Sequence, residues 1–230
     1  KIPVNDVSKK HHPILRNFFE ASQDFNFTLN KQLKSSLENQ VGNYNVNIFD
    51  GFRTSSSTAF LKPIKTHPNL KILTKTEVLK LEYENNKISS LKIKYQNKII
   101  IVKPKIGTIL STGAIMTPYL LLKSGIGSSE ELKDFNIPVN LHSPHIGKNL
   151  QDHLGLDYLY KTSKTTLNYD LGTWSGRIKS IFRYLYNRTG PFALSLNQGG
   201  GYINWNSLEP YPNIQLYFNP LTYSVSYKKN

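Results

Sequence analysis

Two stretches of the sequence carry residue types and spacings that could hold a phosphate-bearing cofactor. They read GAIMTPYLLLKSGIG at 113–127 and HIGKNLQDH at 145–153. In the first, Gly113 and Ala114 follow an apolar run, and their small size lets another group approach the backbone. A helix beginning just after them would offer unpaired N–H groups and the positive end of its dipole, which suit phosphate. Small residues at such a turn also serve tight packing alone, so from these residues both interpretations stay open.

The fingerprint of a dinucleotide phosphate loop, Gly-x-Gly-x-x-Gly between a strand and a helix, does not occur in the sequence. Gly125 and Gly127 have the first spacing, but they follow a predicted helix and Glu130 stands where the third glycine would be. The glycines at 199–201 lie in a predicted loop before a strand. If a dinucleotide binds, its main phosphate loop is therefore expected outside this sequence.

The sequence gives little support for a metal-binding site. The sequence has no cysteine, which excludes disulfides and Cys-ligated zinc or iron–sulfur sites. His142 and His145 have a metal-like spacing, but Pro144 lies between them and no carboxylate is near in sequence. No metal is expected.

The formal net charge of +14 raises the alternative of a module that binds a polyanion. The basic residues are scattered, without a block of five or a basic helix face interleaved with aromatics. Asn, Lys, Ile and Tyr are all abundant and all have A/T-rich codons, so genome bias explains the charge, and no nucleic-acid partner is expected. There is no apolar run of about 18 residues, so no transmembrane span is expected. The chain starts at Lys1 without a signal-peptide segment and is interpreted as an interior segment of a longer protein, with the cytoplasm as the expected compartment.

The elements that must position these stretches follow from periodicity and turn residues. A helix is predicted from Pro13 to about Asp24, followed at 41–61 by a loop that runs into a short helix near 55–61. Residues 70–103 predict a β-meander that starts with LKILT and turns at 84–87 and 96–97.

The first stretch is predicted to lie between a short strand and a helix. The strand is 106–111, and the helix has Thr117 as N-cap, Pro118 at its first position and Gly125 in a left-handed cap. The remaining predictions are helices at 128–135 and 174–190 and strands at 154–160, 198–205 and 213–219.

Four segments, in order, resemble the glucose–methanol–choline (GMC) family of flavin oxidoreductases. The segment 113–127 resembles the family's second signature, and 145–153 is similar to its Val/Ile-Gly-x-Asn-Leu-Gln-Asp-His string. GFRTSSSTAFL (51–61) is similar to its Gly-x-Arg-x-Ser segment, and HPNLKILTKTEVLKL (67–81) to its Asn-Leu-x-Val strand and the strand after it. The signature match runs through nine residues: Gly113, Ala114, Thr117, Pro118, Leu120, Leu121, Ser124, Gly125 and Gly127. In the general character of its sequence, the chain is similar to the bacterial choline-dehydrogenase-like subgroup.

The resemblance implies a fold in two parts. It implies part of an α/β FAD-binding domain, with the β-meander, at 49–152, and part of an α+β antiparallel-sheet substrate domain at 153–230. Residues 1–48 would belong to a substrate-domain or cap portion.

The resemblance also implies FAD as the cofactor and oxidation of a small-molecule alcohol, with hydride passing to the flavin. The backbone of Val78 would pair with the adenine, and Thr112, Gly113 and Ala114 would lie along the FAD. His153 would end the FAD domain near the flavin, either as an active-site wall or as a structural residue. The resemblance also implies that Arg53 and Ser55 support the sheet and the cofactor lid and do not contact the substrate.

Two parts of the family pattern are expected outside the segment: the phosphate loop before residue 1 and the catalytic His after residue 230. The 230 residues alone are therefore expected to be inactive, and a catalytically silent homologue stays an alternative. In choline-oxidising members, as the resemblance has it, a Glu lies two residues after the last His of the second stretch; here that position is Gly155. Asp157 is the nearby carboxylate, and in a strand it would lie roughly 6–7 Å beyond Gly155 on the same face. The electron acceptor stays open.

Overall fold

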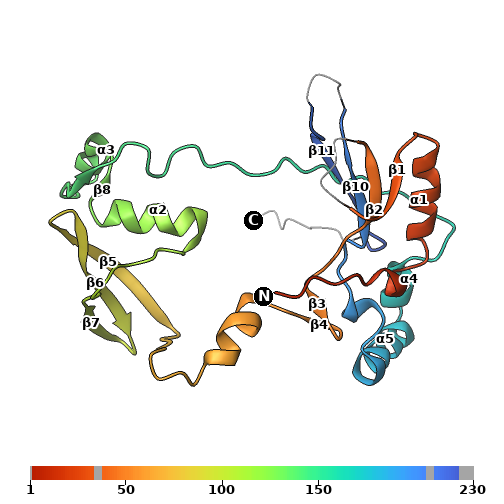
Figure 1. Ribbon diagram of the computed structural model, residues 1–230, viewed down its shortest axis with the longest axis horizontal. Helices are drawn as coiled ribbons and strands as arrows, with labels where there is room; N and C mark the ends of the chain where they lie inside the picture. The colour runs from red at the N-terminus through yellow and green to blue at the C-terminus, as the bar shows by residue number, and fades with distance from the viewer. Residues whose placement is uncertain (1, 34–37, 206–209, 223–230) are drawn as a thin grey trace. The chain divides into compact units, whose positions relative to one another are not determined.

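The computed structural model describes residues 2–33, 38–205 and 210–222, which form two compact units (Figure 1). Unit 1 comprises Lys1–His67 and Asp157–Asn230, and unit 2 comprises Pro68–Leu156. The domain borders predicted at 48/49 and 152/153 separate an FAD-binding portion from substrate-domain portions. This division by function stays a prediction.

Unit 1 is built on a four-stranded sheet in the order β1-β2-β10-β11. β1 and β2 run parallel, whereas β10 pairs antiparallel with both β2 and β11. The strands are β1 Thr28–Gln32, β2 Gln40–Asn43, β10 Gly199–Ile203 and β11 Ile214–Phe218. The strands predicted at 198–205 and 213–219 are confirmed, and the separate prediction that the glycines at 199–201 lie in a loop before a strand is wrong, because they belong to β10. The loop predicted from residue 41 is wrong at its start, where β2 lies. The sequence of β2, QVGN, has no hydrophobic alternation, and its residues are buried because β2 pairs with β10.

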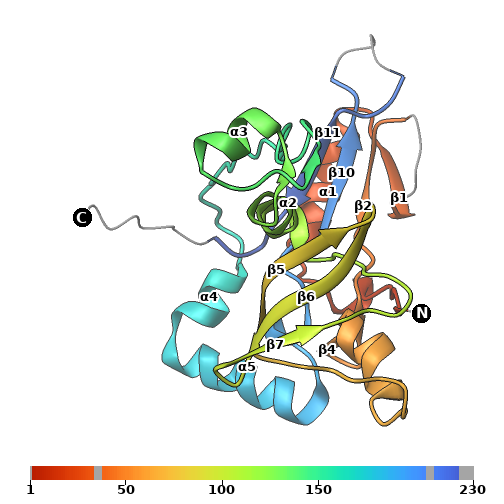
Figure 2. The same cartoon turned by 90° about the vertical axis from the view of Figure 1, so that its left-hand side faces the viewer.

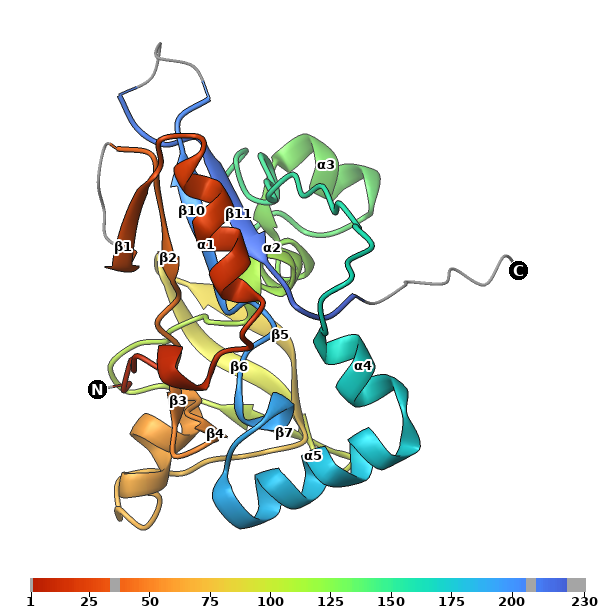
Figure 3. The same ribbon diagram turned by 90° about the vertical axis from the view of Figure 1, so that its right-hand side faces the viewer.

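Helix α1 (Leu15–Gln23) confirms the helix predicted from Pro13, and it contacts β1 and β2 (Figure 3). Its apolar residues recur at helical spacing and so gather on one side. Leu15 is buried, and the Phe18 ring stacks on Phe218 of β11 with 5.0 Å between centroids. The helix therefore closes one face of the sheet.

The glycine run at 199–201 has a packing role in the centre of this sheet. An added Cβ on Gly200 would overlap the Leu216 carbonyl of β11 and lie 2.8 Å from Cε2 of Tyr44. The Tyr44 hydroxyl also donates to the Leu216 carbonyl at 2.7 Å. A side chain is thus excluded by a close approach across the sheet, and no ligand is needed to explain the motif.

A two-residue hairpin joins β3 (Ile48–Phe49) to β4 (Phe52–Arg53). Asp50 and Gly51 both have positive φ, as the tight hairpin turn of an Asp-Gly pair requires. The Asp50-Gly51 pair is a sequence signal for a hairpin, and it lies within the segment 41–61 that was predicted to be a loop. The remaining short helices of this part are η1 (Ser8–Lys10), the π-helical η2 (Ser57–Leu61), η3 (Lys62–Ile64) and η4 (Pro191–Ala193).

Two consecutive helices, α4 (Leu167–Gly172) and α5 (Trp174–Asn187), lie in the second segment of unit 1, after residues 157–166. Thr173 caps α5 by accepting the Gly176 N–H, and Arg188 ends it in the left-handed conformation. The Arg188 guanidinium lies over the rings of Phe52 and Tyr184, at 4.5 and 4.9 Å. This cation–π contact ties the β3–β4 hairpin to the end of α5.

Unit 2 contains the meander of β5 (Thr76–Glu84), β6 (Lys87–Tyr95) and β7 (Lys98–Val102), shown in Figure 2. Both predicted turns are confirmed, with Asn85, Asn86, Gln96 and Asn97 all at positive φ. The predicted LKILT strand is wrong, because residues 70–74 form no ladder.

The rest of unit 2 consists of α2 (Gly113–Lys123), α3 (Ser129–Asp134) and the short parallel pair β8 (Ile126–Gly127) and β9 (Leu141–His142). The helix predicted at 128–135 and the left-handed Gly125 are confirmed. The strand predicted at 106–111 is wrong: these residues pair with no strand, and Ile106 and Ile109 are exposed. A strand needs a neighbouring backbone to pair with, and the described residues provide none here. Within the described part of the chain, no helix has the length and apolar character needed to cross a bilayer.

Candidate functional site

Helix α2 places Thr112, Gly113 and Ala114 at its exposed start. It begins at Gly113, so the predicted cap at Thr117 is wrong and Pro118 lies inside the helix. Thr117 contributes to the N-terminus of α2 through its side chain, from inside the helix. Its Oγ1 accepts the Thr112 N–H at 3.3 Å and lies 2.8 Å from the Thr112 hydroxyl. These contacts hold the first turn of α2, whose residues 112–114 are exposed.

Gly113 has φ +92°, and no atom lies within 4 Å of the place where a Cβ would be. The backbone conformation disfavours any other residue. The open space shows that the chain itself leaves room beside the helix start. A ligand approaching this backbone would meet the unpaired N–H groups of the first helical turn.

Val78 lies on β5, the outer strand of the meander, opposite Ile93 of β6. The register shifts between Val78 and Lys80, so the strand is irregular at this point. An outer strand has backbone groups that are not used by a second neighbour. Val78 can therefore offer main-chain hydrogen bonds to a planar partner.

Helix α2 is fixed to β5 by Ser124. Its hydroxyl accepts the Leu81 N–H at 2.9 Å and donates to the Leu120 carbonyl at 2.6 Å, and both Ser124 and Leu81 are fully buried. Asn140 also donates to the Ser124 carbonyl at 2.8 Å. Val78 and the start of α2 thus lie on two elements, β5 and α2, that the Leu81–Ser124 bond joins. Ser124 was in the recognised signature, but only the structure shows this role.

His153 and Asp157 lie in an extended segment without regular structure, and both are exposed. The strand predicted at 154–160 is wrong, so the face-sharing argument for Asp157 does not hold. The His153 N–H donates to Asp152 Oδ1 at 2.8 Å, a local contact that fixes the backbone but not the ring. His153 belongs to unit 2, and Asp157 begins the second segment of unit 1.

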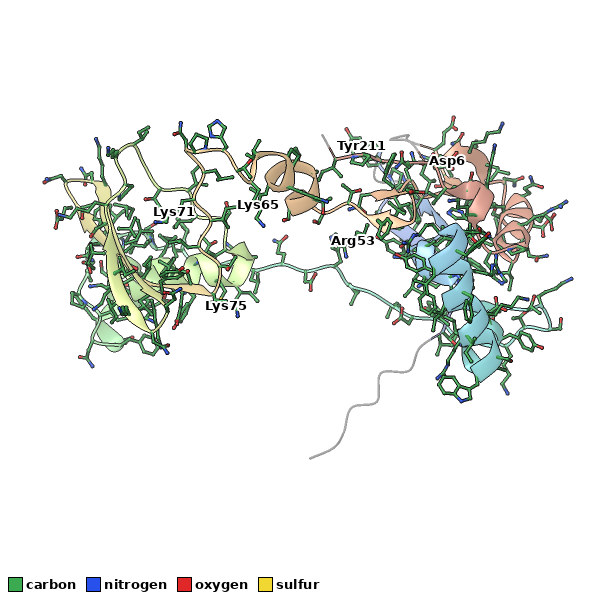
Figure 4. The ribbon with its side chains drawn as sticks, turned by 90° about the horizontal axis from the view of Figure 1, so that it is seen from below. Asp6, Arg53, Lys65, Lys71, Lys75 and Tyr211 are labelled. Atoms are coloured by element: carbon green, nitrogen blue, oxygen red, sulfur yellow. The ribbon has the colours of Figure 1, made fainter. Side chains whose placement is uncertain are left out.

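Arg53 and Ser55 lie in unit 1, after the hairpin turn. Arg53 is exposed on β4 and labelled in Figure 4. Ser55 Oγ accepts the Thr58 N–H at 3.2 Å, so it caps the helical turn near 57–61. Ser55 therefore has a structural use in the segment predicted as a short helix.

The His142 ring caps α3 by accepting the Ser129 N–H at 3.1 Å through Nδ1. The Ser129 hydroxyl is 2.7 Å from the same nitrogen. His142 is thereby explained without a metal, and the described residues contain no group of His, Cys, Asp and Glu that could hold one.

A cleft of about 520 Å³ in unit 1 was not foreseen. It lies between residues 9–13 and the α4–α5–η4 region and includes His12, Asp170, Arg183 and Gln198. Burial lowers the pKa of His12, and the Asp170 charge opposes this effect. Burial likewise lowers the pKa of His11, against the hydrogen bond that its ring donates to Asn43 Oδ1 at 3.0 Å, and burial raises the pKa of Tyr44 to about 12. The three residues with shifted pKa values lie in unit 1, and none of them is a predicted site residue.

Comparison with known proteins places this geometry in context. The family profile described as "GMC oxidoreductase" matches residues 1–155. The chain is 30% identical over 96% of its length to the alcohol dehydrogenase [acceptor] of Pseudomonas putida, of which it covers 40%. It is 30% identical over 91% of its length to the oxygen-dependent choline dehydrogenase of Staphylococcus saprophyticus, of which it covers 37%. The chain therefore spans about two fifths of the length of these relatives.

Among solved structures, the chain is similar to pyridoxine 4-oxidase from Mesorbium loti. The match has a TM-score of 0.62 and 31% identity, and it covers 66% of this chain and 30% of that one.

Proposed function

Because this chain belongs to the GMC oxidoreductase family, we propose that it is part of a flavin-dependent enzyme that oxidises the CH–OH group of a small alcohol. The predicted fold class, part of an α/β FAD-binding domain with part of an α+β substrate domain, is confirmed by this membership. The observation that carries the proposal is the family match over 1–155, which includes the signature at 113–127.

FAD is the cofactor of this family, and the residues of unit 2 fit it. The start of α2 is exposed, its glycine faces open space, and β5 is an outer strand. We propose that Thr112, Gly113 and Ala114 lie along the cofactor and that the Val78 backbone holds its adenine. When bound, FAD supplies the acceptor for the hydride of the alcohol.

The chain's own contribution in this proposal is binding and orientation. The α2 dipole and N–H groups favour the negatively charged part of a cofactor, and the Ser124 contact keeps them in register with Val78. We propose that the Gly-rich phosphate loop and the proton-accepting His are supplied by other parts of the enzyme, since the fingerprint does not occur in this sequence. His153 is proposed as a wall of the active site.

The substrate proposal is a neutral primary alcohol. Gly155 stands where choline-oxidising relatives were expected to have a carboxylate, and it supplies no charge for a quaternary ammonium. The electron acceptor is left open by this argument, because no residue here distinguishes oxygen from a quinone.

The deciding experiment has two arms. The 230-residue chain is passed through gel filtration with FAD and assayed with an alcohol and a redox dye, and the whole enzyme is assayed in parallel. We expect flavin and alcohol-dependent dye reduction in the whole enzyme, but little of either in the chain alone. A whole enzyme that binds FAD without oxidising any alcohol would indicate the silent homologue. Salt-sensitive nucleic-acid binding without flavin would indicate the polyanion module instead.

A further inference from the structure

Helix α2 is held at its C-terminal end by a residue that lies 16 positions further along the chain. The Asn140 side chain donates to the Ser124 carbonyl at 2.8 Å. The backbone N–H groups of Asn140 and Leu141 both donate to the Gly125 carbonyl, at 2.8 and 3.1 Å. Because carbonyl groups at a helix end have no partner within the helix, these donors satisfy groups that would otherwise need water.

The segment approaches the helix end too closely for a side chain at position 125. Gly125 has φ +80°, and an added Cβ would overlap the Pro138 carbonyl and lie 2.9 Å from Asn140 Nδ2. Asn140 itself is not part of the buried core. Replacing its side chain therefore removes one hydrogen bond without opening a cavity.

Ser124 connects this contact to the meander, because α2 packs against β5 (Figure 2). Its carbonyl accepts the Asn140 amide, while its hydroxyl accepts the Leu81 N–H of β5 at 2.9 Å. We call Leu81, Ser124 and Asn140 the α2 anchor. The anchor joins the strand that carries Val78 to the helix that begins at Gly113.

The anchor lies at the opposite end of α2 from the proposed cofactor contacts. The helix has 11 residues, so at about 1.5 Å per residue its start lies about 16 Å from the anchor. A tilt of about 10° at the anchor would therefore move the start by about 3 Å. Since misplacement by about 1 Å can cost about a hundredfold in activity, such a tilt matters to a bound ligand.

We propose that Asn140 is a positioning residue for FAD: it holds the end of α2 and thereby sets where Gly113 lies relative to Val78. This inference rests on the proposed FAD site. Asn140 acts through Ser124 and the helix, not by contact with the cofactor. FAD would span both the β5 contact and the helix start, whereas ADP carries only the adenine half of FAD. Loss of the Asn140 hydrogen bond should therefore weaken the binding of FAD more than that of ADP.

The test is calorimetric titration of the whole enzyme, freed of flavin, with FAD and with ADP. In Asn140→Asp an oxygen replaces Nδ2, so the side chain keeps its shape but the carboxylate has no proton to donate to the Ser124 carbonyl. Asn140→Ala removes the donor without adding a charge. For both variants we expect the Kd of FAD to rise by at least about tenfold, and the Kd of ADP by less than about threefold.

A second readout comes from the bound flavin. At saturating FAD, the visible circular dichroism of the flavin should differ from that of the parent, and alcohol-dependent turnover per bound flavin should decrease. A loss of stability alone changes neither quantity in the enzyme that remains folded. The control is Asn97→Asp, which adds the same charge to an exposed turn of unit 2 and should match the parent in every measurement.

Weaker FAD binding with ADP binding retained supports the positioning role. Equal FAD binding by Asn140→Ala and the parent would overturn it while leaving the proposed function intact. Equal weakening of FAD and ADP would also overturn it, because the loss would then reflect the stability of unit 2. A parent that binds no FAD would overturn the proposed function, and this inference with it.

Discussion

Leu81 and Ser124 are joined by a buried hydrogen bond that couples the meander to α2: the Leu81 N–H donates to Ser124 Oγ at 2.9 Å. Both residues are fully buried, so neither group has water as an alternative partner. The same hydroxyl donates to the Leu120 carbonyl within α2. One serine thus positions β5 relative to the helix whose start is the proposed cofactor site.

Replacing Ser124 with Ala should destabilise the protein by about 1–3 kcal/mol, because the Leu81 N–H would be buried without a partner. The matched control is Ser111→Ala, an exposed serine of the same unit, which should change stability by less than about 0.5 kcal/mol. Urea unfolding measures both. Equal stabilities for the two variants would show that the buried contact contributes nothing.

Replacing Gly200 with Ala should also destabilise the protein, by about 1–3 kcal/mol, since the new Cβ would overlap the Leu216 carbonyl. Gly107→Ala is the control, because its Cβ would meet no atom within 4 Å. Thermal unfolding followed by circular dichroism compares the two. A Gly200→Ala protein as stable as the Gly107→Ala protein would contradict the packing described for β10.

Acidification should destabilise unit 1 through His12. Burial lowers the His12 pKa below its usual 6.5, so below that pH the unfolded chain binds more protons than the fold. The stability is complete above about pH 6.5 and is lost as the pH falls through the lowered pKa. His12→Asn should therefore show a smaller decrease in Tm between about pH 7.5 and about pH 5.5 than the parent protein.

The control for this pH series is His145→Asn, at an exposed histidine of unit 2. It should keep the parent's pH dependence. His11, whose pKa is also lowered by burial, remains in both variants and contributes to the residual slope.

In the whole enzyme, Gly113→Val should reduce the FAD retained through gel filtration far more than Gly172→Val does. Both sites have open space for a side chain, but only Gly113 has a positive φ and lies at the start of α2. Flavin released by heating and measured by fluorescence gives the ratio. The same flavin content in both variants would rule out a cofactor at this helix start.

The whole enzyme should turn over at least one neutral primary alcohol with a higher kcat/KM than choline. A quaternary ammonium in a buried site without an opposing charge costs several kcal/mol, and Gly155 offers none. A steady-state comparison on choline and a panel of neutral alcohols measures this. Higher kcat/KM for choline than for every neutral alcohol would defeat the prediction, and loss of that preference in Asp157→Asn would identify Asp157 as the compensating carboxylate.

The sequence alone determined the family, the turns of the meander and the helices whose apolar residues recur at helical spacing. These features depend on neighbours in sequence: Asn85–Asn86 accept positive φ, and α1 gathers Leu15 and Phe18 on one side whatever it packs against. The signature at 113–127 was likewise recognisable because its residues are consecutive.

Only the tertiary structure decided which apolar segments became strands and what the polar residues do. Residues 106–111 and 154–160 have strand-like patterns but no pairing partner, whereas the polar β2 became a strand because β10 lies beside it. The bond from Leu81 to Ser124 spans 43 positions, and no local pattern encodes it. Pairing and burial depend on groups distant in sequence, and for that reason Ser124, Asn140 and Gly200 acquired their roles only in the folded chain.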